Sequence, residues 1–236
     1  MIKKQIFKIF KINTNEQNRL DWIQKRIQNI PNKQSILDAG AGEMRHRPLC
    51  DHLIYTSQDF CQYSGNGEVG LHPGKWNTEK IDIISDITNI PMPDSSYDNI
   101  ICIEVLEHVP DPSLVIKELS RLLKQNGKLI VTAPFASMTH FAPYFFSTGF
   151  SRHWYEYQTI KNNLKINELV SNGSWFDVFF TYCTIAPSFA EKNRGFIFKI
   201  ILSMLLFPLL VFLRIFPING GDDTLCYGYF CIYEKC

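Results

Sequence analysis

The segment Ser35–Glu43, with the sequence SILDAGAGE, constrains this 236-residue chain more than any other. Its apolar start predicts a buried parallel strand over Gln34–Asp38, too short for a helix and ended by a glycine turn. Gly40 and Gly42 let the backbone turn sharply and let a ligand approach, because neither has a Cβ. A helix starting near Glu43 would point its free N–H groups at that ligand. The segment therefore predicts a nucleotide-type site at the carboxyl end of a first strand.

Further strand-like segments follow in order along the chain. Leu53–Thr56 predicts a second strand, Lys80–Ile84 a third and Tyr97–Ile103 a fourth. The third is followed by Ser-Asp-Ile and a proline-rich turn, and the fourth runs directly into the sequence EVLEHV, residues 104–109. These patterns indicate an α/β chain in which polar residues follow each strand.

The ordered set L-D-x-G-x-G, D-I before a proline-rich turn, and S-Y-D with E-V-L-E-H-V resembles the class I S-adenosylmethionine (SAM) dependent methyltransferases. Within them it is most similar to the group called type 11 methyltransferases, and the resemblance covers about Ser35–Pro134. One departure is Met44, where the family often has a third glycine. A nicotinamide enzyme with G-x-G-x-x-G would need glycine where this chain has Arg45.

The resemblance implies an α/β fold: a Rossmann-like, seven-stranded, mostly parallel sheet with an antiparallel last strand. An apolar helical insertion is expected between the last two strands. The length fits a single domain over 1–236. We expect N-terminal helices in 1–31, a cofactor-binding core in 34–134, and a substrate-side lid with the insertion 196–216 and the final strand in 135–236.

Residue patterns in the second half of the core and beyond predict the remaining elements. Asn126-Gly127 has the composition of a helix C-cap. The expected elements are a helix over Leu114–Lys124, a fifth strand over Lys128–Thr132, a helix over Tyr157–Ser171, a strand over Phe176–Ile185 and a last strand over Leu225–Tyr233.

The resemblance implies SAM as the cofactor. Asp59 is the candidate for the ribose, because a carboxylate accepts two hydrogen bonds from a diol; the alternative is a surface aspartate that caps a turn. Asp86 and Ile87 would bracket the adenine, and Glu104 would lie at the mouth of the site. The expected cofactor-binding residues are Asp38, Ala39, Gly40, Gly42, Asp59, Phe60, Asp86, Ile87 and Glu104.

SAM carries its own activated methyl group, so a base is needed only if the acceptor must lose a proton. His108, His140 and His153 are the candidates, because imidazole titrates near neutral pH. Each also has a purely structural interpretation. The aromatic-rich stretch 135–157 would roof the substrate pocket, either stacking on the acceptor or merely excluding water.

Charge and cysteine content argue against a nucleic-acid partner and against a metal or disulfide site. A net charge of +1 with no long basic stripe argues against nucleic acid. The seven cysteines are scattered, without a C-x-x-C pair, so zinc and a disulfide framework are not expected. We expect no metal site and a reducing, cytoplasmic environment.

Two segments raise the question of a membrane. Met1–Ile12 would form a basic amphipathic helix that either covers the sheet or lies on an anionic surface. Phe196–Phe216 has fourteen uncharged residues between Lys199 and Arg214, with Pro208 among them. A last strand that returns to the sheet argues against a crossing, so we expect membrane-surface contact or packing near the pocket.

The sequence therefore predicts a SAM-dependent methyltransferase that acts on a small-molecule, sugar or lipid-like acceptor, in the cytoplasm or peripherally on the inner face of the membrane. A non-catalytic, membrane-associated SAM-binding protein is one alternative. A nicotinamide-dependent oxidoreductase is another, although the third glycine of its pattern is missing here.

Overall fold

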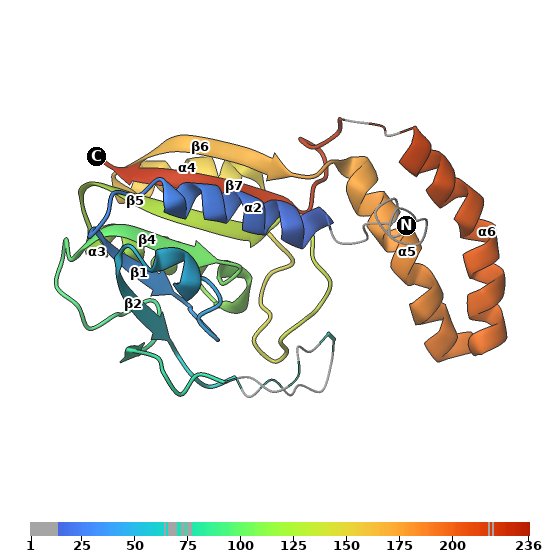
Figure 1. Ribbon diagram of the computed structural model, residues 1–236, viewed down its shortest axis with the longest axis horizontal. Coiled ribbons are helices and arrows are strands. Elements are labelled where there is room, and N and C mark those ends of the chain that lie inside the picture. The colour runs from blue at the N-terminus through green and yellow to red at the C-terminus, as the bar shows by residue number, and fades with distance from the viewer. Residues whose placement is uncertain are drawn as a thin grey trace. The chain divides into compact units, whose positions relative to one another are not determined.

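A computed structural model describes residues 14–63, 65, 70, 71, 74, 77–216, 218 and 220–236 (Figure 1). The chain divides into two compact units. The first, which we call the sheet unit, comprises Arg19–Val170 and Gly228–Cys236. The second, the hairpin unit, comprises Met1–Asn18 and Ser171–Tyr227. The predicted helix over Met1–Ile12 lies outside the described residues.

Seven strands form one mixed sheet in the order β3-β2-β1-β4-β5-β7-β6. The pairs β1–β2, β1–β4, β2–β3 and β4–β5 are parallel, whereas β5 and β7 are antiparallel. This confirms the predicted fold class. The strands are β1 (Ser35–Ala39), β2 (Ile54–Asp59), β3 (Ile83–Ile84), β4 (Tyr97–Ile103), β5 (Leu123–Pro134), β6 (Leu164–Asn172) and β7 (Gly228–Lys235).

Strand β1 lies at the point where the strand order reverses. Its neighbours β2 and β4 lie on either side, and the chain leaves β1 and β4 at the same edge of the sheet. In open α/β sheets this crevice at the carboxyl ends is where ligands bind. The glycine turn predicted from the sequence therefore lies at the expected place.

Helices cover both faces of the sheet unit. Helix α2 (Thr14–Gln28) buries Trp22, Ile23 and Ile27 in a cluster with side chains from β1, β4, β5 and β7. Helices α3 (Pro112–Leu122) and α4 (Arg152–Asn162) serve the opposite face, where Tyr233 donates a hydrogen bond to the carbonyl of Tyr155 in α4. Tyr233 and the clustered Ile232 point to opposite faces, because successive side chains of a strand alternate.

No α-helix begins near Glu43, contrary to the sequence prediction. The chain turns through residues 42–46 and then forms the short 3₁₀-helix η1 (Arg47–Cys50). Met44 has a φ of 55°, which a right-handed helix excludes, and Pro48 follows within a turn. The glycine turn therefore has no helix N-terminus over it.

Helix α3 is also placed differently from its prediction. It starts two residues earlier, because the Asp111 side chain accepts hydrogen bonds from the N–H groups of Ser113 and Leu114. It ends at Leu122, and the chain continues directly as β5. The predicted cap Asn126-Gly127 therefore lies inside β5 rather than at a helix end.

Two elements predicted after the core were wrong. Only the first residues of Tyr157–Ser171 are helical, because Asn163 turns with a φ of 52° and β6 follows. Phe176–Ile185, predicted as a strand, lies inside helix α5 (Trp175–Arg194). Ser174 and Asp177 form a reciprocal capping box there, and this local start signal outweighs the β-propensity of the aromatic residues.

The insertion between the last two strands is thus a pair of helices. Helix α6 (Phe196–Ile215) follows α5 after Gly195, and Lys199 of α6 pairs with Glu191 of α5 at 2.6 Å. At the other end, the start of α5 is held by Tyr227, whose hydroxyl donates to the carbonyl of Asp177 at 2.7 Å. By length and composition α6 is the one helix among the described residues able to cross a membrane.

Candidate functional site

The turn after β1 brings the backbone into close contact with the segment after β4. Gly40 has a φ of 74°, and a Cβ there would lie 2.5 Å from Cγ2 of Val105. The N–H groups of Gly40 and Ala41 both donate to the carbonyl of Gln58 at 2.9 Å. Only glycine fits this position, because the conformation and the space both exclude a side chain.

Asp59 is the last residue of β2, and its side chain connects the turn after β1 to the segment after β2. Its side chain is buried, with Oδ2 accepting from the N–H of Gly42 at 2.9 Å and Oδ1 from the N–H of Cys61 at 2.8 Å. The carboxylate lies at the glycine turn, where a ribose-binding acid is expected. It also caps the start of the next loop, which is the alternative interpretation. Its role at a ribose stays a prediction.

Asp38 lies beneath the turn, buried at the end of β1. The Tyr55 hydroxyl donates to its Oδ2 at 2.7 Å. Burial raises the pKa of Asp38 to about 7; the Tyr55 hydrogen bond opposes the rise and the charge of Asp59 adds to it. Tyr55 carried no motif in the sequence, and only the pairing of β1 with β2 places it there.

Asp86 and Ile87 follow β3, at the same edge as the glycine turn. Ile87 is buried, whereas Asp86 is exposed and its Oδ1 accepts from the N–H of Thr88 at 2.8 Å and from its hydroxyl at 2.7 Å. This is an Asx-type turn. Contact of either residue with adenine stays a prediction.

Glu104, directly after β4, has both carboxylate oxygens engaged. Thr132 donates to Oε1 at 2.8 Å, and Arg19 of α2 forms an ion pair with Oε2 at 2.9 Å. Arg19 therefore belongs to the candidate site, and the sequence analysis missed it. It stands on a helix far from the motifs, so no local signal pointed to it.

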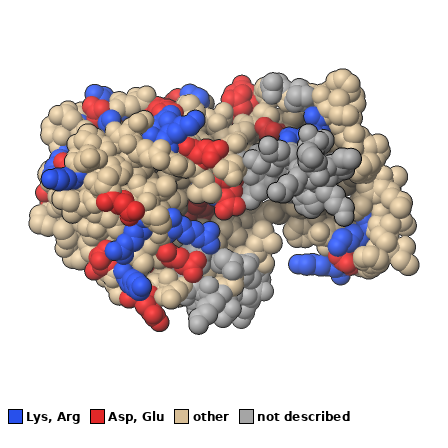
Figure 2. Space-filling model, viewed as in Figure 1, with Lys and Arg blue, Asp and Glu red and all other residues tan. Residues whose placement is uncertain are grey.

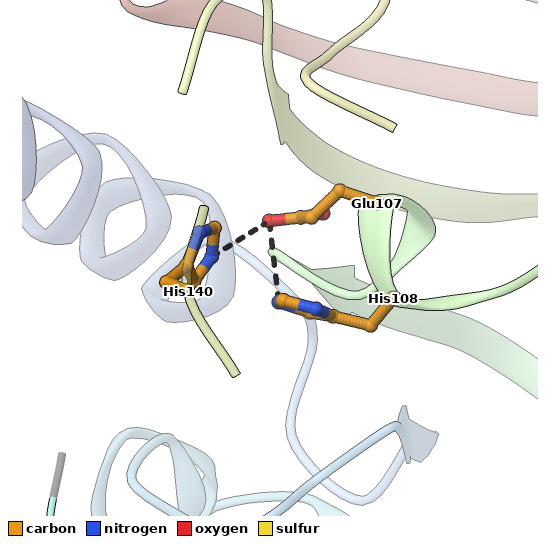
Figure 3. Close-up of side chains that lie close together, drawn as sticks. All are labelled: Glu107, His108 and His140. Carbon is orange, nitrogen blue, oxygen red and sulfur yellow. Dashed lines mark ion pairs between the residues drawn. The ribbon is translucent and has the colours of Figure 1, made fainter. Parts of the chain in front are cut away.

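Beside Glu104, Glu107, His108 and His140 form a compact cluster (Figure 3). Glu107 and His108 lie in the short 3₁₀-helix η2 (Leu106–His108), whereas His140 comes from the loop after β5. Nε2 of His108 lies 3.7 Å and Nε2 of His140 3.9 Å from Oε1 of Glu107. The Glu107 side chain is completely buried, and neither of its oxygens has a hydrogen-bond partner among the described residues.

Backbone carbonyls fix the tautomer that each imidazole ring adopts when it is neutral. Nδ1 of His108 lies 2.6 Å from the carbonyl of Tyr144, and Nδ1 of His140 lies 2.8 Å from that of Met138. A carbonyl only accepts, so each Nδ1 is the protonated donor and each Nε2 of a neutral ring has a lone pair. Burial lowers the pKa of His108 to about 4. Burial, then the charge of Glu104, raises the pKa of Glu107 well above its usual range.

The aromatic stretch closes around this cluster. The predicted cofactor residue Phe60 contacts the Tyr144 ring edge-on at 4.9 Å between centroids. Phe141 and Phe145 lie against the two imidazoles, Phe141 5.0 Å from His108 and Phe145 5.0 Å from His140. His153 is not part of the cluster. It lies on α4 with its side chain 88% exposed and pairs with Glu156.

Comparison with known proteins gives a matching domain and a fold. A family model described as a methyltransferase domain, of type 11, matches residues 37–131. A ubiquinone biosynthesis O-methyltransferase of Acinetobacter baumannii is 28% identical over 116 residues, 46% of this chain and 47% of that protein. One from Xanthomonas oryzae is 51% identical over 37 residues, 16% of each. The chain thus spans at most about half the length of these curated relatives.

Solved structures share the fold at low sequence identity. The YcgJ protein of Bacillus subtilis has a TM-score of 0.54 and 13% identity, covering 93% of this chain and 98% of that one. A sarcosine dimethylglycine methyltransferase structure from Galdieria sulphuraria, named as putative, has a TM-score of 0.53 and 16% identity, covering 94% and 84%. The matched model begins at Leu37 in β1 and ends at Val131 in β5, and so contains the glycine turn, Asp59, Asp86 and the E-V-L-E-H-V segment. Residues 37–131 of this chain therefore match a methyltransferase domain, and the fold is the one these solved structures share.

Proposed function

We propose that the protein binds SAM at the carboxyl ends of β1 and β2 and transfers its methyl group to a small-molecule, sugar or lipid-like acceptor. The observation that carries this proposal is the turn at Gly40 and Gly42, closed against Asp59, within the matched methyltransferase domain. Gly40 and Gly42 give the cofactor close approach, Asp59 and Phe60 serve its ribose side, and Asp86 and Ile87 its adenine. Asp38, Ala39 and Glu104 shape the floor and mouth of the pocket.

SAM supplies an activated methyl on its sulfonium, so the residues of the chain mainly orient the acceptor and exclude water. Rings from the loop after β5, with Phe60, close the region over Glu107. Their negative faces favour a sulfonium cation nearby. An acceptor hydroxyl would also have to lose a proton. The Nε2 atoms of His108 and His140 are the groups placed for that, whereas His153 is not.

We favour a lipid-like aromatic acceptor within this class. The relatives named as ubiquinone biosynthesis O-methyltransferases support an oxygen acceptor on a lipid-bearing ring. The ring-lined surroundings of His108 and His140 suit an aromatic acceptor through edge and face contacts.

Helix α6 supports attachment to a membrane surface. Its side chains are apolar on every side except for Lys199, Ser203 and Arg214, and none is fully buried. Phe196, Ile197, Met204 and Leu205 are each more than 60% exposed. A helix that is apolar all round belongs in a core or in lipid, and this one is not in a core. Figure 2 shows the outer edge of this helix almost free of charge, whereas acidic and basic side chains are interspersed over the sheet unit.

We propose that α6 lies in the interface of the inner membrane face rather than crossing it. A crossing would carry the charged turn between the helices, Glu191, Lys192 and Arg194, to the far side, because the start of α5 is tied to Tyr227, which follows α6 in the chain. Moving such charges through hydrocarbon is costly. Basic Lys192, Arg194 and Lys199 at that turn would instead meet anionic headgroups.

Calorimetry with SAM and S-adenosylhomocysteine tests the cofactor assignment. We expect micromolar binding that Asp59→Ala weakens by about 1–3 kcal/mol, since a charged hydrogen-bond acceptor is lost. Equal binding by the variant would remove Asp59 from the site. Tighter binding of NADH than of SAM would favour an oxidoreductase.

Methyl transfer itself is tested with SAM labelled in its methyl group. The protein is incubated with the lipid, saccharide and small-molecule fractions of a bacterial extract. We expect label in the lipid fraction. SAM binding without transfer to any fraction would favour the non-catalytic alternative, and transfer to the saccharide fraction would contradict the lipid-like acceptor.

A further inference from the structure

In the part of the chain that the structure describes, the Glu107 carboxylate is buried without the hydrogen-bond partners that buried acids usually have. It has no exposed surface and no hydrogen-bond partner among the described residues, although burying a carboxyl group without partners is costly. The Nε2 atoms of His108 and His140 face its Oε1 at 3.7 and 3.9 Å. Each side chain thus turns its acceptor atom toward the same small space (Figure 3).

A shared proton does not explain the arrangement. If Glu107 were protonated, its hydroxyl would have to lie about 2.7–3.2 Å from an imidazole nitrogen to donate to it. The observed 3.7 and 3.9 Å are too long for a direct hydrogen bond. All three ligand atoms lie within 4.8 Å of one another, which leaves room for an atom between them.

The hydrogen bonds behind the imidazoles have the form found at metal sites. A histidine that binds a metal through one nitrogen usually donates from the other to a carbonyl or carboxylate, which fixes the ring. Both Nδ1 atoms do this here, toward the carbonyls of Tyr144 and Met138. Two imidazole nitrogens and one carboxylate suit zinc and related transition metals, whereas magnesium and calcium prefer oxygen ligands.

We propose that Glu107, His108 and His140 bind one divalent transition metal ion, with zinc as the best match to the ligand set. Ligands about 2.0–2.1 Å from a tetrahedral zinc lie roughly 3.4 Å apart, so small side-chain rotations suffice from the present 3.7 and 3.9 Å. Three protein ligands leave a fourth position open, and the His108 and His140 side chains are 17% and 22% exposed.

This site goes beyond the proposed methyl transfer and does not depend on it. The open position would take water or an oxygen of a small molecule. With a metal bound, the Nε2 lone pairs of His108 and His140 would no longer be free to accept a proton. If the proposed function holds, an acceptor hydroxyl bound at the open position would instead lose its proton more readily through the metal. The sequence predicted no metal, because cysteine spacing was the only ligand pattern visible along the chain.

The test uses the full chain, stripped with a chelator and free of SAM. Calorimetry with zinc is expected to show one ion per chain, and cobalt is expected to give visible d–d bands of a nitrogen and oxygen site without a thiolate charge-transfer band. Zinc affinity should fall at least tenfold in His140→Ala and in Glu107→Gln. The matched control His153→Ala, an exposed histidine outside the cluster, should bind as the wild type does.

The wild-type measurements decide the proposal even if a variant fails to fold, which circular dichroism would reveal. Absence of one-to-one binding would overturn it. So would a thiolate charge-transfer band, which would assign the metal to cysteines, or unchanged affinity in a folded His140→Ala protein. Because no SAM is present, failure here leaves the proposed methyl transfer untouched, and failure of SAM binding leaves the metal site untouched.

Discussion

At the turn after β1, the conformation of one residue decides how closely two segments approach. Gly40 combines a φ of 74° with contact to Val105, whereas Gly195 has a φ of 84° but only open space where a Cβ would lie. Comparing the two separates backbone strain from steric overlap, because both residues have a positive φ and only Gly40 is crowded.

We expect Gly195→Ala to lower the free energy of unfolding by about 1–3 kcal/mol from backbone strain alone, because a φ of 84° with a ψ of 174° suits glycine only. Gly40→Ala should cost about 1–3 kcal/mol more, since the added methyl overlaps Val105, and Gly40→Val should also abolish SAM binding. Urea unfolding and calorimetry measure both effects. Equal destabilisation at the two positions would contradict the close approach to Val105.

The buried carboxyl group of Asp38 should make stability depend on pH. Its pKa rises from 3.8 to about 7 on folding, so between these values the unfolded chain has lost a proton that the folded chain keeps. The free energy of unfolding should therefore fall through this window as pH rises, by roughly 4 kcal/mol at most.

Asp38→Asn removes the titrating group while its oxygen still accepts from Tyr55. The variant should gain stability relative to the wild type as pH rises from 4 to 8. Urea unfolding of both proteins across this range gives the difference curve. A difference that does not change with pH would show that Asp38 is ionised in the folded protein as readily as in the unfolded chain.

At the scale of single elements, α6 makes the clearest prediction. Leu205 is 68% exposed and Leu209 37% exposed on this helix, whereas Ile160 on α4 and Leu114 on α3 are exposed apolar residues of the sheet unit. The pair Leu205→Asp with Leu209→Asp places charge on the proposed membrane-contacting helix. The pair Ile160→Asp with Leu114→Asp places the same charge elsewhere, and so serves as the matched control.

Sedimentation with anionic vesicles at low salt is expected to carry down the wild type and the control pair. The α6 pair should stay in the supernatant, and raised salt should weaken wild-type binding in part. Alkaline carbonate should release the bound protein. Resistance to carbonate would mean that α6 spans the membrane, and no sedimentation at all would remove the membrane from the proposal.

On the scale of the whole molecule, the helix pair leaves and rejoins the sheet at adjacent points. The N–H of Tyr227, just before β7, donates to the carbonyl of Asn172 at the end of β6 at 2.9 Å. The two residues that flank the insertion, Asn172 and Tyr227, are therefore close enough to be joined by a short connection. The expectation of a single domain over 1–236 stays a prediction, which the following variant bears on.

Replacing residues 174–224 with a short glycine–serine linker should leave the sheet unit folded. Its SAM affinity should stay within about threefold of the wild type, because the proposed cofactor residues all lie in residues 38–104, and vesicle binding should be lost. Circular dichroism, calorimetry and sedimentation measure the three outcomes. Loss of SAM binding by a folded deletion protein would show that the insertion is needed for the pocket.

The residues themselves were enough to predict the central strand of this protein and the glycine turn that follows it. The apolar strand, its acid and the paired glycines of residues 35–43 predicted the central strand and turn, because burial and the absence of a Cβ are properties of the residues themselves. The order of strands followed from the resemblance. Predictions failed where a cap decided: Asp111 moved the start of α3, and Ser174 starts the helix α5 where a strand was predicted.

Only the tertiary structure decided which distant groups meet. Arg19 reaches Glu104, Tyr55 reaches Asp38, and His140 reaches Glu107 across 33 positions of sequence, although none of these pairs has a signature along the chain. The reason is physical. Strand pairing and loop closure bring such side chains together, and a ligand set or a raised pKa exists only once burial has removed water from between them.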